Sequence, residues 1–286
     1  MNDSHQPIPP GKTQTNTAIS RRNWLAAGIA SAGAAGLMTT GTNAAGSAVT
    51  LPLTAQATEG PYYFDAAKVR ADITEGLPGV PLEVRFVVMD ASGAPLPGLR
   101  VDIWHCNAAG LYSGYAGQGD NRRTSTVGAT FLRGTLMADA GGIAAFHTVY
   151  PGWYEGRTTH IHFKVLGGAR PVLTSQFFLP DALSEFLYTS LPDYKRAQVR
   201  QTLNRNDGIA LMAGSTVLGA VREEADRYVA TLNLVVNPLA GAATGAAQGM
   251  PGERRGPPPG GMGGPARGNA LDPATRLSAL VPGKRR

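Results

Sequence analysis

The stretch Tyr150-Pro-Gly-Trp-Tyr-Glu-Gly-Arg-Thr-Thr-His-Ile-His-Phe163 brings a phenol, a guanidinium and two imidazoles into one short segment. His160 and His162 are separated by one residue, and in a β-strand this spacing places both side chains on the same face, about 6.5–7 Å apart along the chain. Ile161 and Phe163 then fall on the opposite face, where they suit a hydrophobic core. The segment therefore predicts a strand that faces the core on one side and supplies half of a metal site on the other.

Short alternating segments separated by turns continue outward from this strand in both directions. Residues 90–95 and 138–142 are rich in the turn formers Gly, Asp, Ser and Pro. Many short strands with frequent turns predict an all-β fold, an antiparallel β-sandwich. The predicted strands are 82–89, 99–104, 130–137, 143–149, 160–166, 172–179 and 227–237.

One short helical excursion and two disordered ends complete the predicted fold. Apolar residues recur at helical spacing in residues 180–188 and again in 192–200. After residue 237, Gly and Pro dominate and almost nothing aromatic is available for burial, which predicts a disordered tail over 238–286. The 286 residues, of which 43% are hydrophobic, suffice for one sizeable core. We therefore expect a single sandwich domain over 46–237.

The net charge of +6 is concentrated at the two ends of the chain. Residues 1–49 carry about +2 and residues 238–286 about +5, so the remaining sandwich is near −1. A nucleic-acid-binding domain needs its basic residues on the folded surface that meets the phosphates. The distribution therefore argues against a nucleic-acid partner.

The N-terminal charge belongs to a segment that resembles a bacterial twin-arginine export signal. Arg21 and Arg22 precede an apolar run over 26–38 and small residues over 44–48 that suit cleavage. A short membrane anchor is the alternative, but roughly 14 weakly apolar residues are too few to span a bilayer. We expect residues 1–45 to be a cleaved signal and the protein to be periplasmic or extracellular. The only cysteine, Cys106, lies far from this segment, so nothing indicates a lipid anchor, and a buried strand cysteine is favoured over a reactive thiol.

Two tyrosines complete a ligand set with the histidine pair. Tyr112 follows a predicted strand and a glycine-containing loop, and Tyr154 precedes the histidines by a few residues. Phenolate is a hard anionic ligand that favours a trivalent ion, whereas zinc draws Cys, His or carboxylate. Ionising a phenol at pH 7 costs roughly 4 kcal/mol, which a trivalent cation supplies. Iron(III) fits best, although taken singly each residue also has a purely structural interpretation, as a rim aromatic or a polar strand face.

Five segments together resemble the intradiol ring-cleavage dioxygenases, of the protocatechuate 3,4-dioxygenase type. A His-x-His pair alone is common, but the five segments in this order are highly specific, and the resemblance covers about residues 54–237. The segments are Thr58-Glu-Gly-Pro-Tyr-Tyr63, Asp102-Ile-Trp-His-Cys-Asn-Ala-Ala-Gly-Leu-Tyr-Ser113, Pro151-Gly-Trp-Tyr154, Arg157-Thr-Thr-His-Ile-His-Phe163 and Thr174-Ser-Gln176.

The resemblance implies one non-haem iron(III) per chain, a catechol-type substrate and O2, with ring opening between the two hydroxylated carbons. Its implied iron ligands are Tyr112, Tyr154, His160 and His162, of which Tyr154 leaves when the substrate binds. Arg157 is implied to stabilise carbanionic charge on the substrate, Gln176 to lie beside the oxygen pocket, and Tyr62 or Tyr63 to contact the substrate. His105 and His147 match no ligand position, so we expect both to be structural.

Departures from the family pattern leave the substrate open. The interval before the first predicted strand is too short for the long helical segment of catechol 1,2-dioxygenases, which disfavours that subgroup. Only Glu155 and Gly156 separate Tyr154 from Arg157, a shorter link than in the better-known members, which indicates a remodelled pocket wall. Simple catechols, carboxylated catechols and larger phenols all stay open, as does a homo-oligomer. The alternative function is an exported, non-catalytic β-sandwich that binds a metal or another ligand.

Overall fold

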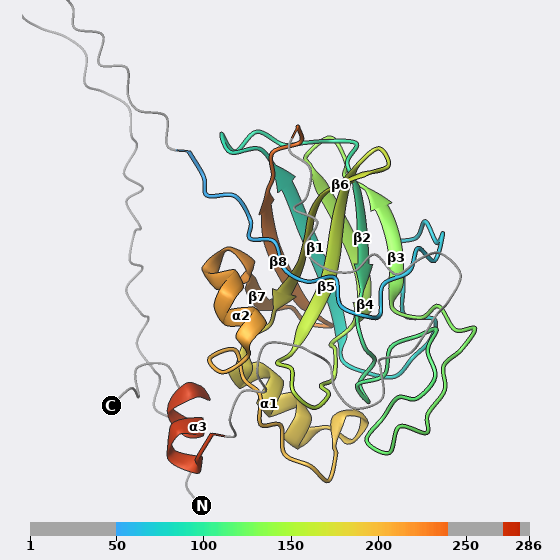
Figure 1. Ribbon diagram of the computed structural model, residues 1–286, viewed down its shortest axis with the longest axis vertical. Helices are drawn as coiled ribbons and strands as arrows, with labels where there is room; N and C mark the ends of the chain where they lie inside the picture. The colour runs from blue at the N-terminus through green and yellow to red at the C-terminus, as the bar shows by residue number, and fades with distance from the viewer. Residues whose placement is uncertain (1–49, 240–270, 281–286) are drawn as a thin grey trace, which may run out of the picture. The chain divides into compact units, whose positions relative to one another are not determined.

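Two four-stranded sheets pack face to face in the computed structural model, which describes residues 50–239 and 271–280 (Figure 1). The predicted sandwich is confirmed, and each of the seven predicted strands is present with ends shifted by at most a few residues. The strands are β1 (Pro81–Met89), β2 (Arg100–Trp104), β3 (Arg133–Met137), β4 (Ile143–Val149), β5 (His160–Gly167), β6 (Arg170–Phe178), β7 (Ala220–Glu223) and β8 (Tyr228–Val235).

The strand order is β4-β1-β8-β7 in one sheet and β3-β2-β5-β6 in the other. Neighbours are antiparallel except β1 and β8, which pair in parallel from Leu82 opposite Tyr228 to Met89 opposite Val235. This one pair departs from the antiparallel arrangement predicted for the sandwich. Parallel neighbours need a long crossover connection, and here the whole second sheet lies between the two strands in sequence.

The hydrophobic core fills the space between the sheets. Phe163 of β5 packs on Phe86 of β1, with ring centres 4.9 Å apart, and both side chains are fully buried. Ile161 and Val165 of β5 point the same way and are also fully buried. The predicted core face of β5 is therefore confirmed, and His160 lies on the opposite, outer face of that sheet.

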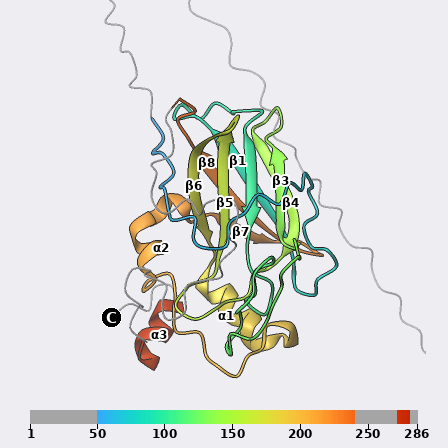
Figure 2. The ribbon, with the colours of Figure 1, turned by 45° about the vertical axis from the view of Figure 1, so that its right-hand side comes forward.

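Short helices follow β6, and α1 lies at one end of the sandwich while α2 lies beside the strands (Figures 1 and 2). The helix α1 ends before Pro192, because the residue preceding a proline is disfavoured in a helix. The second predicted helix, 192–200, is wrong beyond its first turn, since only η1 forms and residues 195–200 are irregular. The helices of this region are α1 (Asp181–Ser190), η1 (Pro192–Tyr194), α2 (Gly208–Ala213) and η2 (Gly214–Val217).

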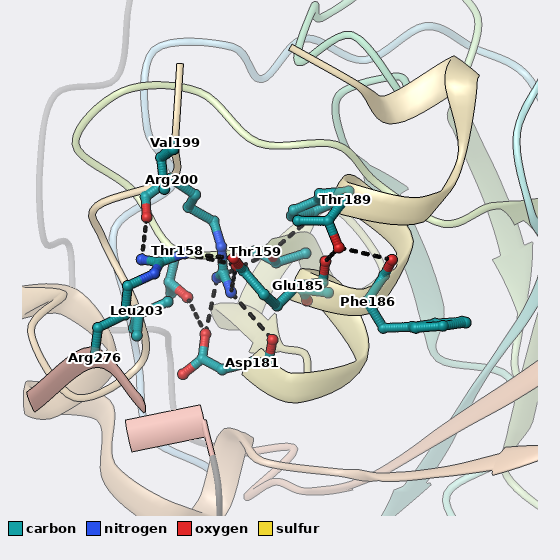
Figure 3. Close-up of polar contacts among 12 residues, drawn as sticks. Thr158, Thr159, Asp181, Glu185, Phe186, Thr189, Val199, Arg200, Leu203 and Arg276 are labelled. Carbon is teal, nitrogen blue, oxygen red and sulfur yellow. Dashed lines mark hydrogen bonds and ion pairs between the residues drawn. The ribbon is translucent and has the colours of Figure 1, made fainter. Parts of the chain in front are cut away.

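Arg200 holds the irregular segment 195–202 against α1 (Figure 3). Its side chain is almost fully buried, donates a 2.8 Å hydrogen bond to Asp181 and lies 3.7 Å from a Glu185 carboxylate oxygen. Arg276 donates to the Arg200 carbonyl oxygen and, at 2.7 Å, to both oxygens of Glu185. These charge pairs replace the helical hydrogen bonds that the apolar spacing of this segment predicted.

Part of the C-terminal tail is ordered as the helix α3 (Pro273–Leu280). Here the structure differs from the predicted disorder, because Asp272 accepts a hydrogen bond from the backbone of Thr275 and Pro273 occupies the first helical position. The predicted signal over 1–45 and most of the tail lie outside the described residues. Among the residues that the structure does describe, no helix combines the length and the apolar character needed to cross a bilayer.

Candidate active site

The two histidines of β5 lie side by side on the face that points away from the core. His160 and His162 are both buried, because the loops around them cover this face of the sheet. The His162 ring stacks on Trp104 of the neighbouring β2, with ring centres 5.0 Å apart and an angle of 12° between the planes. The residue spacing in the sequence thus correctly predicts a shared, buried face for the histidine pair.

The two predicted tyrosine ligands come from two loops that touch each other through glycines. A Cβ atom on Gly110 would lie 2.2 Å from the carbonyl oxygen of Trp153, and one on Gly152 would lie 2.1 Å from the carbonyl oxygen of Ala108. Gly110 also has a φ of +79°, in the left-handed region that favours glycine. This close approach of the loop after β2 and the loop before β5 brings the two phenols together.

Four donor atoms converge where these loops meet β5. The Tyr112 phenol oxygen lies 3.3 Å from His160 Nε2 and 3.5 Å from the Tyr154 phenol oxygen. The Tyr154 phenol oxygen and His162 Nε2 each lie 3.1 Å from His160 Nε2. Ligands on one transition-metal ion with bonds of about 2.0–2.1 Å stand roughly 3–3.5 Å apart. The set therefore has the spacing of a metal centre.

The histidines are prepared as neutral ligands. His160 Nδ1 donates a 2.7 Å hydrogen bond to the carbonyl oxygen of Thr158, so Nε2 keeps its lone pair for a metal. Burial lowers the pKa of His160 to about 3, with the Arg157 charge adding to the effect. Burial likewise lowers the pKa of His162 well below its ordinary value, and the charge that His160 would carry lowers it further. Neither imidazole needs to lose a proton at neutral pH before it binds a cation.

The phenols are neutral in the absence of a cation. Burial raises the pKa of Tyr112 well above 10, and the neighbouring Tyr154 raises it further. Burial also raises the pKa of Tyr154, against the lowering effect of the Arg157 charge. A trivalent ion offsets this cost most readily, whereas the residues that the structure describes contain no cluster of three His, Cys or carboxylate ligands that would suit zinc. The donor set fits iron(III).

Arg157 is fixed beside the ligands by two partners. Its Nε donates to Asp207 at 2.8 Å and its Nη2 to the Gln176 side-chain oxygen at 2.6 Å. Gln176 lies opposite His162 on β6 and donates to the carbonyl oxygen of Thr58. The structure thus brings Arg157 and Gln176 together, and it adds Asp207, which the sequence analysis missed.

Asp207 serves two purposes at once. One carboxylate oxygen accepts from Arg157 and from the backbone of Thr158, and the other caps α2 by accepting from the backbones of Ile209 and Ala210. Burial alone would raise the pKa of Asp207, but the Arg157 charge and these hydrogen bonds hold it below its ordinary value. An aspartate before a short apolar run is a common helix cap, so no sequence signal connected it with an arginine 50 residues earlier.

The structure separates the two tyrosines predicted to contact the substrate. Tyr62 stacks on Tyr112 with ring centres 4.3 Å apart, next to the ligand set. Tyr63 instead donates a 2.9 Å hydrogen bond to Asp102 and packs under Lys164, whose ammonium lies 3.6 Å from its ring centre. Tyr62 is brought to the site and Tyr63 is not.

Three further residues lie outside the ligand set. His105 is buried between Thr148 and the carbonyl oxygen of Cys106, and burial lowers its pKa to about 4. His147 lies on the exposed side of β4. Cys106 is buried as predicted, and burial raises the pKa of its thiol to about 12.

Gln118 is a second residue that the sequence analysis missed. It is buried, and its side chain accepts a 2.7 Å hydrogen bond from the Tyr112 backbone nitrogen and donates one of the same length to the Tyr112 carbonyl oxygen. This double contact fixes the loop that carries the first phenol.

A cavity of about 500 Å³ opens beside Tyr154. Its wall combines residues 153–156, which carry this ligand, with residues 196–202 of the irregular segment that Arg200 holds. Tyr154 lines the cavity, and the other three candidate ligands do not.

Comparison with known proteins identifies the family of this chain. Residues 58–203, half of the chain, match the family model described as "Dioxygenase", and these residues hold all four candidate ligands and Arg157. The chain belongs to the intradiol ring-cleavage dioxygenase family.

Comparisons with individual relatives support the same family assignment. An intradiol ring-cleavage dioxygenase from Tetranychus urticae superimposes with a TM-score of 0.61 at 28% identity, over 67% of this chain and 97% of that chain. A chlorocatechol 1,2-dioxygenase from Pseudomonas sp. (strain P51) is 30% identical over 143 residues, which are 43% of this chain and 54% of the relative. The protocatechuate 3,4-dioxygenase beta chain from Burkholderia cepacia is 33% identical over 135 residues, 41% of this chain and 55% of the relative. The chain thus spans about half the length of these curated relatives, and their similar identities do not separate the subgroups.

Proposed function

We propose that the protein is a non-haem iron(III) dioxygenase that inserts both atoms of O2 into a catechol-type aromatic and opens the ring between the two hydroxylated carbons. The convergence of two phenol oxygens and two imidazole nitrogens at 3.1–3.5 Å carries the proposal. Two of its relatives, a chlorocatechol 1,2-dioxygenase and a protocatechuate 3,4-dioxygenase chain, support the same reaction and a catechol-type substrate.

Tyr112, Tyr154, His160 and His162 would hold the iron. When bound, iron(III) supplies a Lewis acid that lowers the pKa of the catechol hydroxyls and of both phenols. Of the four candidate ligands only Tyr154 belongs to the cavity wall. We infer that the substrate enters there and that the Tyr154 phenol oxygen accepts a proton from a catechol hydroxyl. Tyr112 is more deeply buried, with its backbone fixed by Gln118, and keeps its place.

Arg157 supplies a fixed positive charge beside the reacting ring. Its guanidinium is held by Asp207 and Gln176, and it is desolvated with the rest of the site. Preorganised charge in a water-poor site stabilises developing negative charge more strongly than the same charge in water. Arg157 therefore stabilises negative charge on the substrate ring as the ring carbon attacks O2. One oxygen atom enters each of the two new carboxyl groups, which gives a muconate-type product.

The proposal is tested with purified protein loaded with iron(III). We expect a visible absorption band from iron-bound tyrosinate, uptake of one O2 per catechol and a diene product that carries both atoms of labelled O2. Tyr154→Phe, which keeps the ring and removes the ligand oxygen, should change the band. An iron-loaded protein that shows the band but consumes no O2 across a panel of catechols would instead favour the non-catalytic metal-binding alternative.

We also propose that the protein is exported through its twin-arginine segment, on the strength of Arg21, Arg22 and the apolar run that follows them. Export of a folded chain allows iron to be inserted before the protein leaves the cytoplasm. Cell fractionation tests this proposal. Arg21→Lys combined with Arg22→Lys should retain the protein in the cytoplasm, and export of the double variant would contradict the signal.

A further inference from the structure

The cavity beside Tyr154 is much larger than a single aromatic ring requires. An apolar cavity of about 150 Å³ is enough to bind benzene, whereas this cavity measures about 500 Å³. Cavities of roughly 300–1,000 Å³ are typical of sites for larger organic ligands. A one-ring catechol held at Tyr154 would leave most of the volume to water.

The part of the cavity away from Tyr154 has a neutral, partly apolar wall. Val199 lines this part of the cavity and is 58% exposed. Gln198, Gln201 and Thr202 add amide and hydroxyl groups, which both donate and accept hydrogen bonds. This combination suits a second ring or side chain that carries uncharged polar groups such as phenols.

The charged groups of the wall disfavour a carboxylated substrate. Asp120, Glu155 and Arg196 give the lining a formal charge of −1. Arg196 pairs with Asp120, donates to the carbonyl oxygen of Trp153 and lies 4.1 Å from the centre of the Trp153 ring. Arg157, which follows the wall residue Gly156 in the sequence, is already engaged by Asp207 and Gln176. Among the described lining residues, the only cationic side chain, Arg196, is already paired with Asp120, so a carboxylate on the substrate would have no free cationic partner.

The wall is also held in place from behind. Arg200, between Val199 and Gln201, is buried and paired with Asp181, and its backbone oxygen accepts from Arg276 (Figure 3). The alternation of exposed wall residues with this anchored arginine fixes the segment against α1. Contacts within the folded chain therefore hold this part of the cavity wall in place.

We propose that the substrate is an uncharged catechol that carries a second ring or a side chain of similar size, with the catechol ring at Tyr154 and the extension along residues 196–202. This substrate class rests on the proposed ring-cleavage function and makes it more specific. Of the three substrate classes that the sequence left open, namely simple catechols, carboxylated catechols and larger phenols, this proposal selects the larger phenols. The short Glu155–Gly156 link, which predicted a remodelled pocket wall, lies in the cavity wall next to Tyr154.

The test compares 4-phenylcatechol, catechol and 3,4-dihydroxybenzoate as substrates of the iron-loaded protein. We expect kcat/KM to be at least tenfold higher for 4-phenylcatechol than for catechol, and lowest for the carboxylate. Val199→Trp should fill the extension and lower the ratio of the first two values at least fivefold. Val127→Trp is the matched control, because Val127 is 66% exposed but lies outside the cavity, and it should leave the ratio unchanged.

Calorimetric titration of the iron-free protein separates the two proposals. We expect tighter binding of 4-phenylcatechol than of catechol, and loss of this preference in Val199→Trp. Cleavage of catechol or of the carboxylate with equal or greater kcat/KM would overturn the substrate class and leave the proposed function intact. If no compound is cleaved, the proposed function fails, and equal binding of the ligands to the iron-free protein would then overturn the substrate class as well.

Discussion

Replacing Asp207 by Asn tests how the chain positions Arg157, the arginine that we propose stabilises charge on the substrate. Asn caps helices about as well as Asp, so its side-chain oxygen can still accept from the backbones of Ile209 and Ala210. The amide nitrogen then faces Arg157 Nε and the Thr158 backbone nitrogen, where the carboxylate accepted two hydrogen bonds of 2.8 and 2.9 Å. The amide N–H groups of the asparagine would then face the N–H groups of Arg157 and Thr158, and no hydrogen bond can form between two donors. The Arg157 guanidinium therefore loses the acceptor that fixes its Nε.

The expected cost follows from these contacts. Each hydrogen bond to a charged group contributes about 1.5–3 kcal/mol, and breaking a buried ion pair costs about 3–5 kcal/mol. The Arg157 side chain is 13% exposed and Asp207 only 2%, so water relieves a small part of the loss. We expect the free energy of unfolding to fall by about 3 kcal/mol, the lower end of this range. A displacement of Arg157 by about 1 Å should lower kcat about 10²-fold.

Asp102→Asn is a matched control. Asp102 is also buried, and it accepts from Arg100 at 2.7 Å, but it touches neither the ligands nor Arg157. Both variants should unfold at lower denaturant concentrations, and only Asp207→Asn should lose most of its kcat while KM and iron content stay near the wild-type values. Equal kcat in the two variants would refute the positioning of Arg157 by Asp207.

Three other predictions follow from the structure. His160→Ala should lose its iron and its visible band, whereas His147→Ala, on the exposed side of β4, should keep both; metal analysis of the two purified variants decides. Gly156→Ala should lower the free energy of unfolding by about 1–2 kcal/mol, because its φ is +85° although the space around it is open. Gly152→Ala should lower it further, because the added Cβ would lie 2.1 Å from the Ala108 carbonyl oxygen. Equal melting temperatures for the two variants would contradict the close contact of the two loops. The Arg157–Asp207 pair holds the pKa of Asp207 below its ordinary value. The stability that the pair contributes is therefore complete above about pH 4 and is lost as pH falls through the lower pKa of the folded state. The free energies of unfolding of the wild type and of Asp207→Asn, measured between pH 2 and 7, should therefore converge at the acid end.

Local patterns in the sequence predict the parts of the site that lie on one element. The alternation in β5 places Phe163 in the core and His160 in the site, and the spacing of the histidines follows from the same rule. The order of the motifs supplies the two tyrosines. None of these predictions required knowledge of how distant segments meet.

Contacts between distant segments are the part that could not be predicted. The close approach at Gly110 and Gly152 depends on how two loops pack, which no periodicity encodes. Residues 195–200 have helical spacing, but burial of Arg200 against Asp181 outweighs the propensity of this segment. The parallel pairing of β1 with β8 likewise joins strands that lie far apart in the sequence.

The alternation of core-facing and site-facing residues along β5 also limits which insertions the protein can tolerate. A single residue inserted between His160 and His162 would place these two side chains on opposite faces of β5, so that one imidazole would face the core and leave the site. Such an insertion would destroy stability and metal binding in one event. This restriction does not apply to the loops that carry the tyrosines or to the loops that form the cavity wall, because their residues do not alternate between core and site. Differences in length among relatives should therefore collect in the loops, and new substrate ranges can arise there while the strand keeps a constant number of residues.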